Sequence, residues 1–168
     1  IRKAMASVAS YFAEYVMIKG EIDIKNEDGL VSGSDISKVL ENAMKSKIKP
    51  GFEMVTIIPI GFKLDNGEEV KDPKGMETSK LEVRAIMVMT PKKNIYSVVS
   101  LIENLGIEVI DISLNNIGDL CTFKTKEIEE KIGAVINVGY ETTSVSLYNK
   151  GIVVKSSILP VGGRNIDN

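Results

Sequence analysis

The chain has 168 residues, 43% of them apolar, and its 21 basic and 23 acidic side chains give a formal net charge of −2. This balance provides no net basic attraction for nucleic acid, so no nucleic-acid partner is expected. The chain contains no histidine and one cysteine, Cys121, which excludes a disulfide framework, a His/Cys metal site and a Ser-His-Asp triad. We expect Cys121 to be a small, mostly buried side chain in a reducing, cytosolic protein. No apolar run approaches the roughly 18 residues that span a bilayer.

The two ends of the chain lack the usual boundaries of a domain. Ile1–Phe12 has apolar residues at helical spacing, so we predict an amphipathic helix that no N-cap precedes. The last residues, from Gly162 to Asn168, look like the lead-in to a further helix. We therefore expect the chain to be a piece of a longer protein.

The next segment predicts a small α+β unit. Tyr15–Ile24 matches a strand, and Ser34-Asp35 is predicted to cap a helix that ends near residue 47. Glu53–Leu64 and Leu81–Met89 then match two strands, separated by polar residues with turn signals. We predict that these two strands pair in one sheet and that the helix packs across one face of it.

An α/β rhythm follows this unit. We predict a helix over Pro91–Leu105 that ends at a glycine, and a short buried strand over Ile107–Ile112. Another helix is predicted to begin in Leu114–Cys121. Lys124–Lys131 is a charged, solvated connector. The order of elements predicts an α/β protein into which the preceding α+β unit is inserted.

The segment Gly133–Gly163 predicts three strands around a loop that contains glycine and threonine. We expect Val145 and Leu147 to face inward and Ser146 to face outward. The expected strands are 134–138, 144–148 and 152–159. Backbone N–H groups and threonine hydroxyls in such a loop can hold a phosphate. The alternative is an ordinary β-meander whose loop happens to contain these residues.

Several sequence stretches occur in a recognisable order. They are Ile58-Pro59, Phe62-Lys63-Leu64-Asp65, Lys71-Asp72-Pro73-Lys74-Gly75-Met76, Lys80-Leu81-Glu82-Val83 and Ile102–Val109. With Gly133–Gly163 at the place of a second phosphate loop, they resemble the bacterial cell-division actin homologue FtsA. The resemblance covers nearly the whole chain, from about residue 4 to residue 163.

This resemblance implies a mixed α/β fold with an α+β insertion, namely a fragment of an actin/Hsp70-like ATPase domain that carries a strand-helix-strand-strand (SHS2) subdomain, 1C. Residues 1–12 would be a helix of subdomain 1A, and residues 13–90 would be subdomain 1C. Residues 91–131 would continue 1A, and residues 132–168 would begin subdomain 2A with the second phosphate hairpin.

The same resemblance implies an adaptor that polymerises and links the ring of the tubulin-like protein FtsZ to the membrane. Its implied partners are FtsZ, other division proteins and further copies of itself, at the inner face of the bacterial cell membrane at the division site. The membrane would be reached only through a C-terminal helix outside these residues. The full-length relative binds ATP and Mg²⁺, but we expect no nucleotide to bind this chain alone and assign no catalytic or metal-ligating residue.

The loop departs from the family pattern, which usually runs Asp-x-Gly-Gly-Gly-Thr-Thr. Asn137 replaces the aspartate that helps to place Mg²⁺ and water, and Tyr140 and Glu141 replace two glycines. An amide is a poorer ligand for a hard cation, and a carboxylate about 4 Å from a phosphate costs roughly 1 kcal/mol in water. We therefore expect a weak or lost ATP site. The residues that the resemblance places around a phosphate are Asn137, Gly139, Tyr140, Glu141, Thr142, Thr143, Gly162 and Gly163.

Two alternatives stay open. One is an active actin-like ATPase that tolerates Asn137, and the other is a PilM-type adaptor of pilus assembly, which shares the actin fold and the 1C module. The run Asp72–Met76 favours FtsA over PilM. Within the family resemblance, we expect an exposed face of the 1C unit to carry partner contacts. The charged connector at residues 68–74 is a candidate, with a merely solvated loop as the other interpretation.

Overall fold

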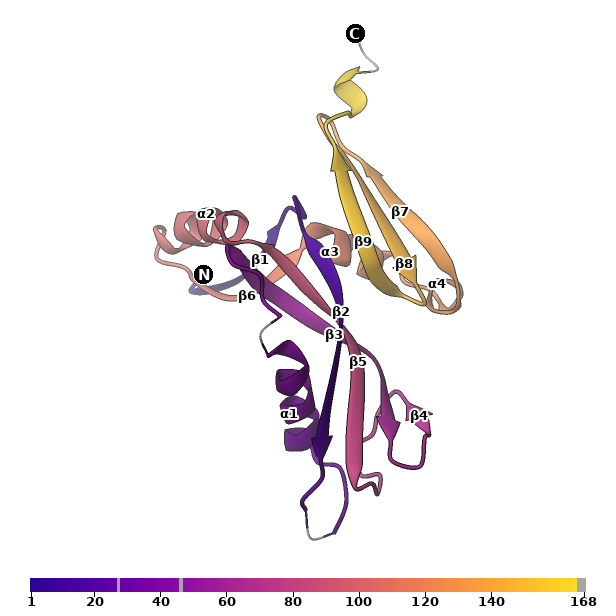
Figure 1. The fold of residues 1–168 in the computed structure, drawn as a ribbon. Helices are drawn as coiled ribbons and strands as arrows, with labels where there is room; N and C mark the ends of the chain where they lie inside the picture. The colour runs from indigo at the N-terminus through magenta and orange to yellow at the C-terminus, as the bar shows by residue number, and fades with distance from the viewer. Residues whose placement is uncertain (27, 46, 166–168) are drawn as a thin grey trace. The chain divides into compact units, whose positions relative to one another are not determined.

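The computed structural model describes residues 1–26, 28–45 and 47–165. The chain divides into two compact units (Figure 1). The first unit contains residues 1–15, 51–55 and those from 89 onward, and the second contains residues 16–50 and 56–88.

The second unit contains one helix and most of a four-stranded sheet. The strand order is β2 (Glu14–Asp23), β5 (Lys80–Pro91), β3 (Phe52–Leu64) and β4 (Glu69–Val70). The predicted strands are therefore present, and β5 lies next to β3 in one sheet, as expected. The odd-numbered residues of β5 from 81 to 89 are all buried, because a strand turns alternate side chains to one face.

The helix α1 (Gly33–Met44) packs very closely on β2, beside which it lies in Figure 1. A β carbon on Gly20 would lie only 2.6 Å from the backbone nitrogen of Ala43 and 2.7 Å from the carbonyl oxygen of Val39. The side-chain oxygen of Asn42 also accepts a hydrogen bond from the backbone N–H of Glu21 at 3.3 Å. The absence of a side chain at position 20 thus permits the approach of the helix to the strand.

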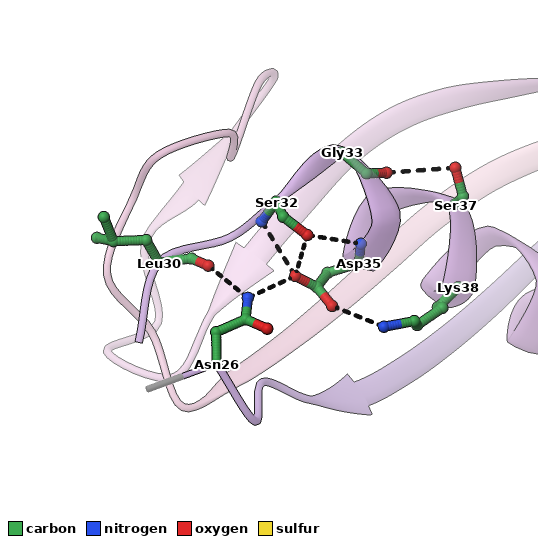
Figure 2. A network of polar contacts seen from close by, with 7 residues as sticks. All are labelled: Asn26, Leu30, Ser32, Gly33, Asp35, Ser37 and Lys38. Carbon is green, nitrogen blue, oxygen red and sulfur yellow. Dashed lines mark hydrogen bonds and ion pairs between the residues drawn. The ribbon is translucent and has the colours of Figure 1, made fainter. Parts of the chain in front are cut away.

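The helix α1 begins earlier than the sequence indicated. Its N-cap is Ser32, not Ser34, and Asp35 occupies the N3 position of a capping box (Figure 2). The Asp35 carboxylate accepts hydrogen bonds from the backbone N–H of Ser32 at 3.0 Å and from the amide of Asn26 at 2.8 Å, and Lys38 lies 3.3 Å away. The hydrogen bond from the Ser32 hydroxyl is the main cause that holds the pKa of this buried carboxyl well below its usual range.

The segment between β3 and β5 is held by polar contacts at both of its ends. The Asp65 carboxylate accepts hydrogen bonds from the N–H and the hydroxyl of Ser79, at 2.8 and 2.5 Å. Further along, Val31 exchanges backbone hydrogen bonds with Met76 and Gly75, each 2.9 Å long. The motif residues of this segment therefore join the loop before α1 to the loop before β5.

The first unit begins with a strand, so the predicted helix over Ile1–Phe12 is wrong. β1 (Lys3–Val8) pairs in parallel with β6 (Glu108–Leu114). Ala6 and Val8 are buried while Met5 is 68% exposed, which is the alternation of a strand. The small apolar residues of this segment fit the spacing of a helix as well as that of a strand. The pairing with β6 makes the segment a strand.

Two helices and a short helical turn complete the α/β part. They are α2 (Lys92–Glu103), α3 (Asn115–Thr122) and α4 (Lys126–Glu130). Gly106, with φ at +75°, follows α2 as expected for a residue that ends a helix. The charged connector contains α4 and is exposed, in agreement with its composition.

The last sheet has three antiparallel strands: β7 (Ile132–Val138), β8 (Thr143–Asn149) and β9 (Ile152–Leu159) (Figure 1). The predicted facing of β8 is wrong, because Ser146 is 2% exposed and Leu147 is 44% exposed. Contacts of α3 with β7 and β9 place the helix against this sheet. A polar strand face is thus buried where an apolar one was expected.

Candidate functional site

A hollow of about 180 Å³ lies in the first unit, beside the loop between β7 and β8. Its walls come from the turn after β1, from the N-terminal half of α3 and from the strands β7 to β9. The polar residues that line it are Ser10, Tyr11, Asn115, Asn116, Asp119, Asn137, Thr142 and Ser144. The hollow therefore contains one carboxylate, three amides and no cationic side chain.

The Asn137 side chain is engaged across the hollow. Its amide nitrogen donates a hydrogen bond to the carboxylate of Asp119 on α3, at 3.1 Å. One of the two N–H groups of the Asn137 amide is thereby used, and its second N–H and its oxygen are left for a ligand. Asp119 supplies the carboxylate that position 137 lacks, from a different element.

A buried polar network includes Asn116, which lines the hollow. The Asn116 amide nitrogen donates to the Tyr15 hydroxyl at 2.5 Å, and the Ser156 hydroxyl also donates to it, at 3.3 Å. Burial is the main cause that raises the pKa of Tyr15, and the two hydrogen bonds oppose it. Within the described part of the chain, the Asn116 side-chain oxygen is buried without a hydrogen-bond partner.

Two of the donors expected for a phosphate are used in hydrogen bonds to other backbone groups, one within the loop and one to the segment after β9. The N–H of Gly139 donates to the carbonyl oxygen of Thr142 at 2.8 Å. The hydroxyl of Thr143 donates to the carbonyl oxygen of Val161 at 2.7 Å. These contacts stabilise the loop and leave fewer groups for an anion.

Gly162 and Gly163 hold the loop from its outer side. The N–H of Gly163 donates to the carbonyl oxygen of Gly139, and the N–H of Arg164 to that of Tyr140, both at 2.9 Å. A β carbon on Gly162 would lie 2.5 Å from each of these carbonyl oxygens. We call residues 161–165 the clamp, because they fix the loop through its backbone.

The remaining two predicted residues point away from the hollow. Tyr140 is 69% exposed. The Glu141 carboxylate pairs with the Arg164 guanidinium at 2.9 Å, so its charge is partly compensated. Of the eight predicted positions, only Asn137, Gly139 and Thr142 line the hollow.

Sequence reasoning missed the contribution of α3 and of the turn after β1. Asn115 accepts a hydrogen bond from the Ser7 hydroxyl at 2.5 Å, and Asn116 is 1% exposed. The signal was a pair of asparagines and an aspartate at the start of a predicted helix. Such residues also serve as ordinary caps, so their spacing alone did not indicate a site.

The residues present do not fit a tightly bound Mg²⁺-nucleotide. A single carboxylate and neutral amides offer a weak set of ligands for a hard cation. A phosphate would meet the Asp119 carboxylate without a cation in the wall of the hollow. Among the described residues there is also no group of three or more His, Cys, Asp or Glu side chains that could hold a metal.

Two further properties bear on the possible chemistry. Cys121 is exposed rather than mostly buried as expected. In the described ranges, none of the helices has the length and hydrophobicity that crossing a membrane requires.

Comparison with known families shows that the chain is similar to the FtsA family. Residues 14–89 match the SHS2 domain inserted in FtsA. The chain is 26% identical over 167 residues to the cell division protein FtsA of Bacillus subtilis, covering 99% of the chain and 38% of that relative. It is 30% identical over 144 residues to FtsA of Staphylococcus epidermidis, covering 83% of the chain and 30% of the relative. It is 28% identical over 167 residues to FtsA of Helicobacter pylori, covering 98% of the chain and 33% of that relative.

A solved structure, the PilM-PilN type IV pilus biogenesis complex, is similar in fold. The TM-score is 0.50 at 11% identity, with 90% of this chain and 41% of that chain covered. At this identity the likeness concerns the fold alone. The chain spans between 30% and 40% of the length of the FtsA relatives that it matches. The resemblance to FtsA and the mixed α/β fold with an SHS2 unit are thereby confirmed.

Proposed function

We propose that this chain, whose residues 14–89 form an SHS2 domain of the FtsA kind, is part of a cell-division adaptor. The observation that carries the proposal is that this match is accompanied by similarity to FtsA over nearly the whole chain. The adaptor would polymerise and link the FtsZ ring to the membrane at the division site. These finer properties are expectations from the family.

The second unit offers charged surface for protein contacts. A hollow of about 480 Å³ is lined by charged side chains from all four strands: Lys19, Glu21, Lys63, Glu69, Glu82 and Arg84. Glu69 pairs with Arg84 at 3.0 Å, and Glu21 with Lys80 at 2.8 Å. We assign partner contacts to the surface around this hollow and to the adjoining connector at residues 68–74, because charges of both signs on one surface favour a selective protein partner.

The adaptor would bind ATP weakly and hydrolyse it slowly or not at all. This part of the proposal is supported by the pairing of Asn137 with Asp119 and by the absence of a cation from the residues that line the hollow. The repulsion expected from Glu141 is a weaker argument than the sequence suggested, since Arg164 neutralises that carboxylate. Scaffolding rather than turnover is then the main activity.

Localisation in dividing cells tests the proposal. A fluorescent fusion of the protein that contains these residues is expected at the division site, and its depletion is expected to produce filamentous cells. Charge reversal at Glu68, Glu69 and Lys74 is expected to weaken its self-association. Reversal of Glu41, an exposed glutamate on α1, is the matched control. Normal division after depletion, with the protein spread evenly through the cell, would exclude the division role.

Two other functions, an active ATPase and a PilM-type adaptor, can each be distinguished from the proposed division adaptor by a specific observation. An active ATPase would turn over Mg-ATP in the presence of Asn137, at the rate of a competent family member. A PilM-type adaptor is favoured by the fold likeness to the PilM-PilN complex. Loss of pili with normal division after depletion would favour that alternative.

A further inference from the structure

The hollow beside the β7–β8 loop is lined by a buried side chain with an unused acceptor. Asn116 is 1% exposed, and its amide nitrogen donates to the Tyr15 hydroxyl. Its amide oxygen is buried, yet no N–H or O–H group of the described residues donates to it. A buried oxygen without a partner is costly in a native structure, so this oxygen requires a partner that comes from outside the chain.

Further oxygen atoms around the hollow are also unused. Asn137 donates to Oδ2 of Asp119 at 3.1 Å, whereas Oδ1 of that carboxylate has no hydrogen bond to any residue that the structure describes. In the same ranges, the amide oxygen of Asn137 and the hydroxyl of Ser144 are not hydrogen-bonded either. No lysine or arginine lines the hollow. The hollow thus combines one negative charge with several neutral oxygen atoms and has no positive charge to balance them.

We propose that this hollow binds one singly charged cation, K⁺, between α3 and β7. Asp119 would supply the charge, and Asn116 and Asn137 would supply neutral amide oxygens. Neutral carbonyl oxygens can replace the hydration shell of K⁺, whereas Mg²⁺ loses its water reluctantly and is bound through carboxylates. A hollow of about 180 Å³ has room for the ion together with several waters.

The bound ion would connect segments that are distant in the sequence. Asn116 and Asp119 belong to α3, while Asn137 belongs to β7. A cation shared by these side chains would stabilise the contact of the helix with the three-stranded sheet. This role is structural and goes beyond the proposed division role, because it requires neither ATP nor a protein partner.

NMR of the full-length protein tests the proposal directly. K⁺ replaces choline at constant ionic strength and constant chloride, and the side-chain amide signals of Asn116 and Asn137 are followed. Both signals are expected to shift with K⁺ and to reach saturation, because both oxygens bind the ion. Choline is too large to enter a hollow of this volume. Millimolar Mg²⁺ added in place of K⁺ is expected to leave the signals unchanged.

A pair of variants separates the site from a general effect of salt. Asp119→Asn removes the charge of the hollow and is expected to lower the affinity for K⁺ about tenfold. Glu103→Gln is the control, since it removes an exposed carboxylate at the end of α2 that does not line the hollow. This control should bind K⁺ as the unaltered protein does. Thermal unfolding should show the same order, with a midpoint that K⁺ raises in the unaltered protein and in Glu103→Gln only.

Signals of Asn116 and Asn137 in the unaltered protein that do not differ between K⁺ and choline would overturn the proposal, because a hollow that contains water alone gives that result. This measurement does not depend on the folding of any variant. An equal response to K⁺ in Asp119→Asn and in Glu103→Gln would overturn it as well. Either negative result would leave the division role intact, because localisation and depletion do not depend on this ion.

Discussion

The side-chain amide of Asn137 donates a hydrogen bond to the carboxylate of Asp119, 3.1 Å away across a hollow of about 180 Å³. The two residues come from β7 and α3 and are far apart in the sequence. Their contact means that the loop does not simply lack a carboxylate. The negative charge is present, but it comes from the helix, and the amide of Asn137 occupies one of its oxygens.

Asn137→Asp should therefore place two carboxylates, at positions 119 and 137, next to each other. Like-charge repulsion at this distance is expected to lower the free energy of unfolding by about 1 kcal/mol in the absence of metal. Millimolar Mg²⁺ should restore the loss, because two carboxylates form a better site for a hard cation than a carboxylate and an amide. Thermal unfolding with and without Mg²⁺ measures both effects.

The double variant in which the two side chains change places is the control for Asn137→Asp. Asn137→Asp combined with Asp119→Asn keeps one amide and one carboxylate in contact, so it should retain near-normal stability and gain nothing from Mg²⁺. If the single variant is as stable as the unaltered protein and insensitive to Mg²⁺, the contact between the two side chains is not maintained in solution.

Gly162→Ala should disturb the loop strongly. Its β carbon would lie 2.5 Å from the carbonyl oxygens of Gly139 and Tyr140, so the clamp must move away and break the hydrogen bonds at these residues. A loss of roughly 2 kcal/mol in the free energy of unfolding is expected. Hydrogen exchange should show faster exchange at the N–H groups of Gly163 and Arg164.

Gly118→Ala is the matched control for the clamp. Gly118 lies within α3, and a β carbon there would meet no atom within 4 Å. Alanine is a better helix former than glycine by about 1 kcal/mol, so this variant should be as stable as the unaltered protein or more stable. Equal stability of the two variants would show that the clamp does not pack on the loop as described.

Gly20→Ala tests the packing of α1 on β2 in the second unit. The added carbon would lie 2.6 Å from the backbone nitrogen of Ala43, and neither strand nor helix backbone can yield without loss of contacts. We expect a loss of about 2–3 kcal/mol, measured by urea denaturation. Gly33→Ala, where a β carbon meets nothing within 4 Å, should change stability by less than about 1 kcal/mol.

Asp35 should make the stability of the second unit depend on acid. Its pKa is lowered in the folded state, so its contribution is fully present above the unfolded value near 4 and is lost as the pH falls through the folded value. Asp35→Asn should reduce the free energy of unfolding by roughly 1–2 kcal/mol at neutral pH and flatten its decline below about pH 4. Chemical denaturation across this pH range is the measurement, and an equally steep decline in the variant would contradict the role of Asp35.

The element types of the SHS2 unit could be predicted because its patterns are long and have one period. The odd-numbered residues of β5 from 81 to 89 are buried, although residues 85–90 are buried on both faces of the strand. The run from Asp65 to Ser79 carries turn signals, and the hydrogen bonds between these two residues hold its ends together. The start of α1 was misplaced by two residues, since Ser32 and Ser34 are both good caps and only the contacts of Asp35 decide between them.

The first unit was harder to predict because distant pairing determines its structure. A short run of small apolar residues in Ile1–Phe12 suited a helix as well as a strand, and its partner β6 lies about a hundred residues later. Ser146 is buried although it is polar. The hollow could be predicted only in part, because three of its eight polar residues come from α3, which contacts the sheet only in the folded chain.

Vesicle flotation tests the proposed function, an FtsA-like adaptor that links FtsZ to the membrane. The purified full-length protein that contains these residues is mixed with lipid vesicles and with FtsZ polymers from the same cell, and the floating fraction is measured. We expect FtsZ to float only when this protein is present, and to do so equally without ATP hydrolysis. FtsZ that stays at the bottom of the gradient in its presence, while the protein itself floats, would exclude the proposed link between FtsZ and the membrane.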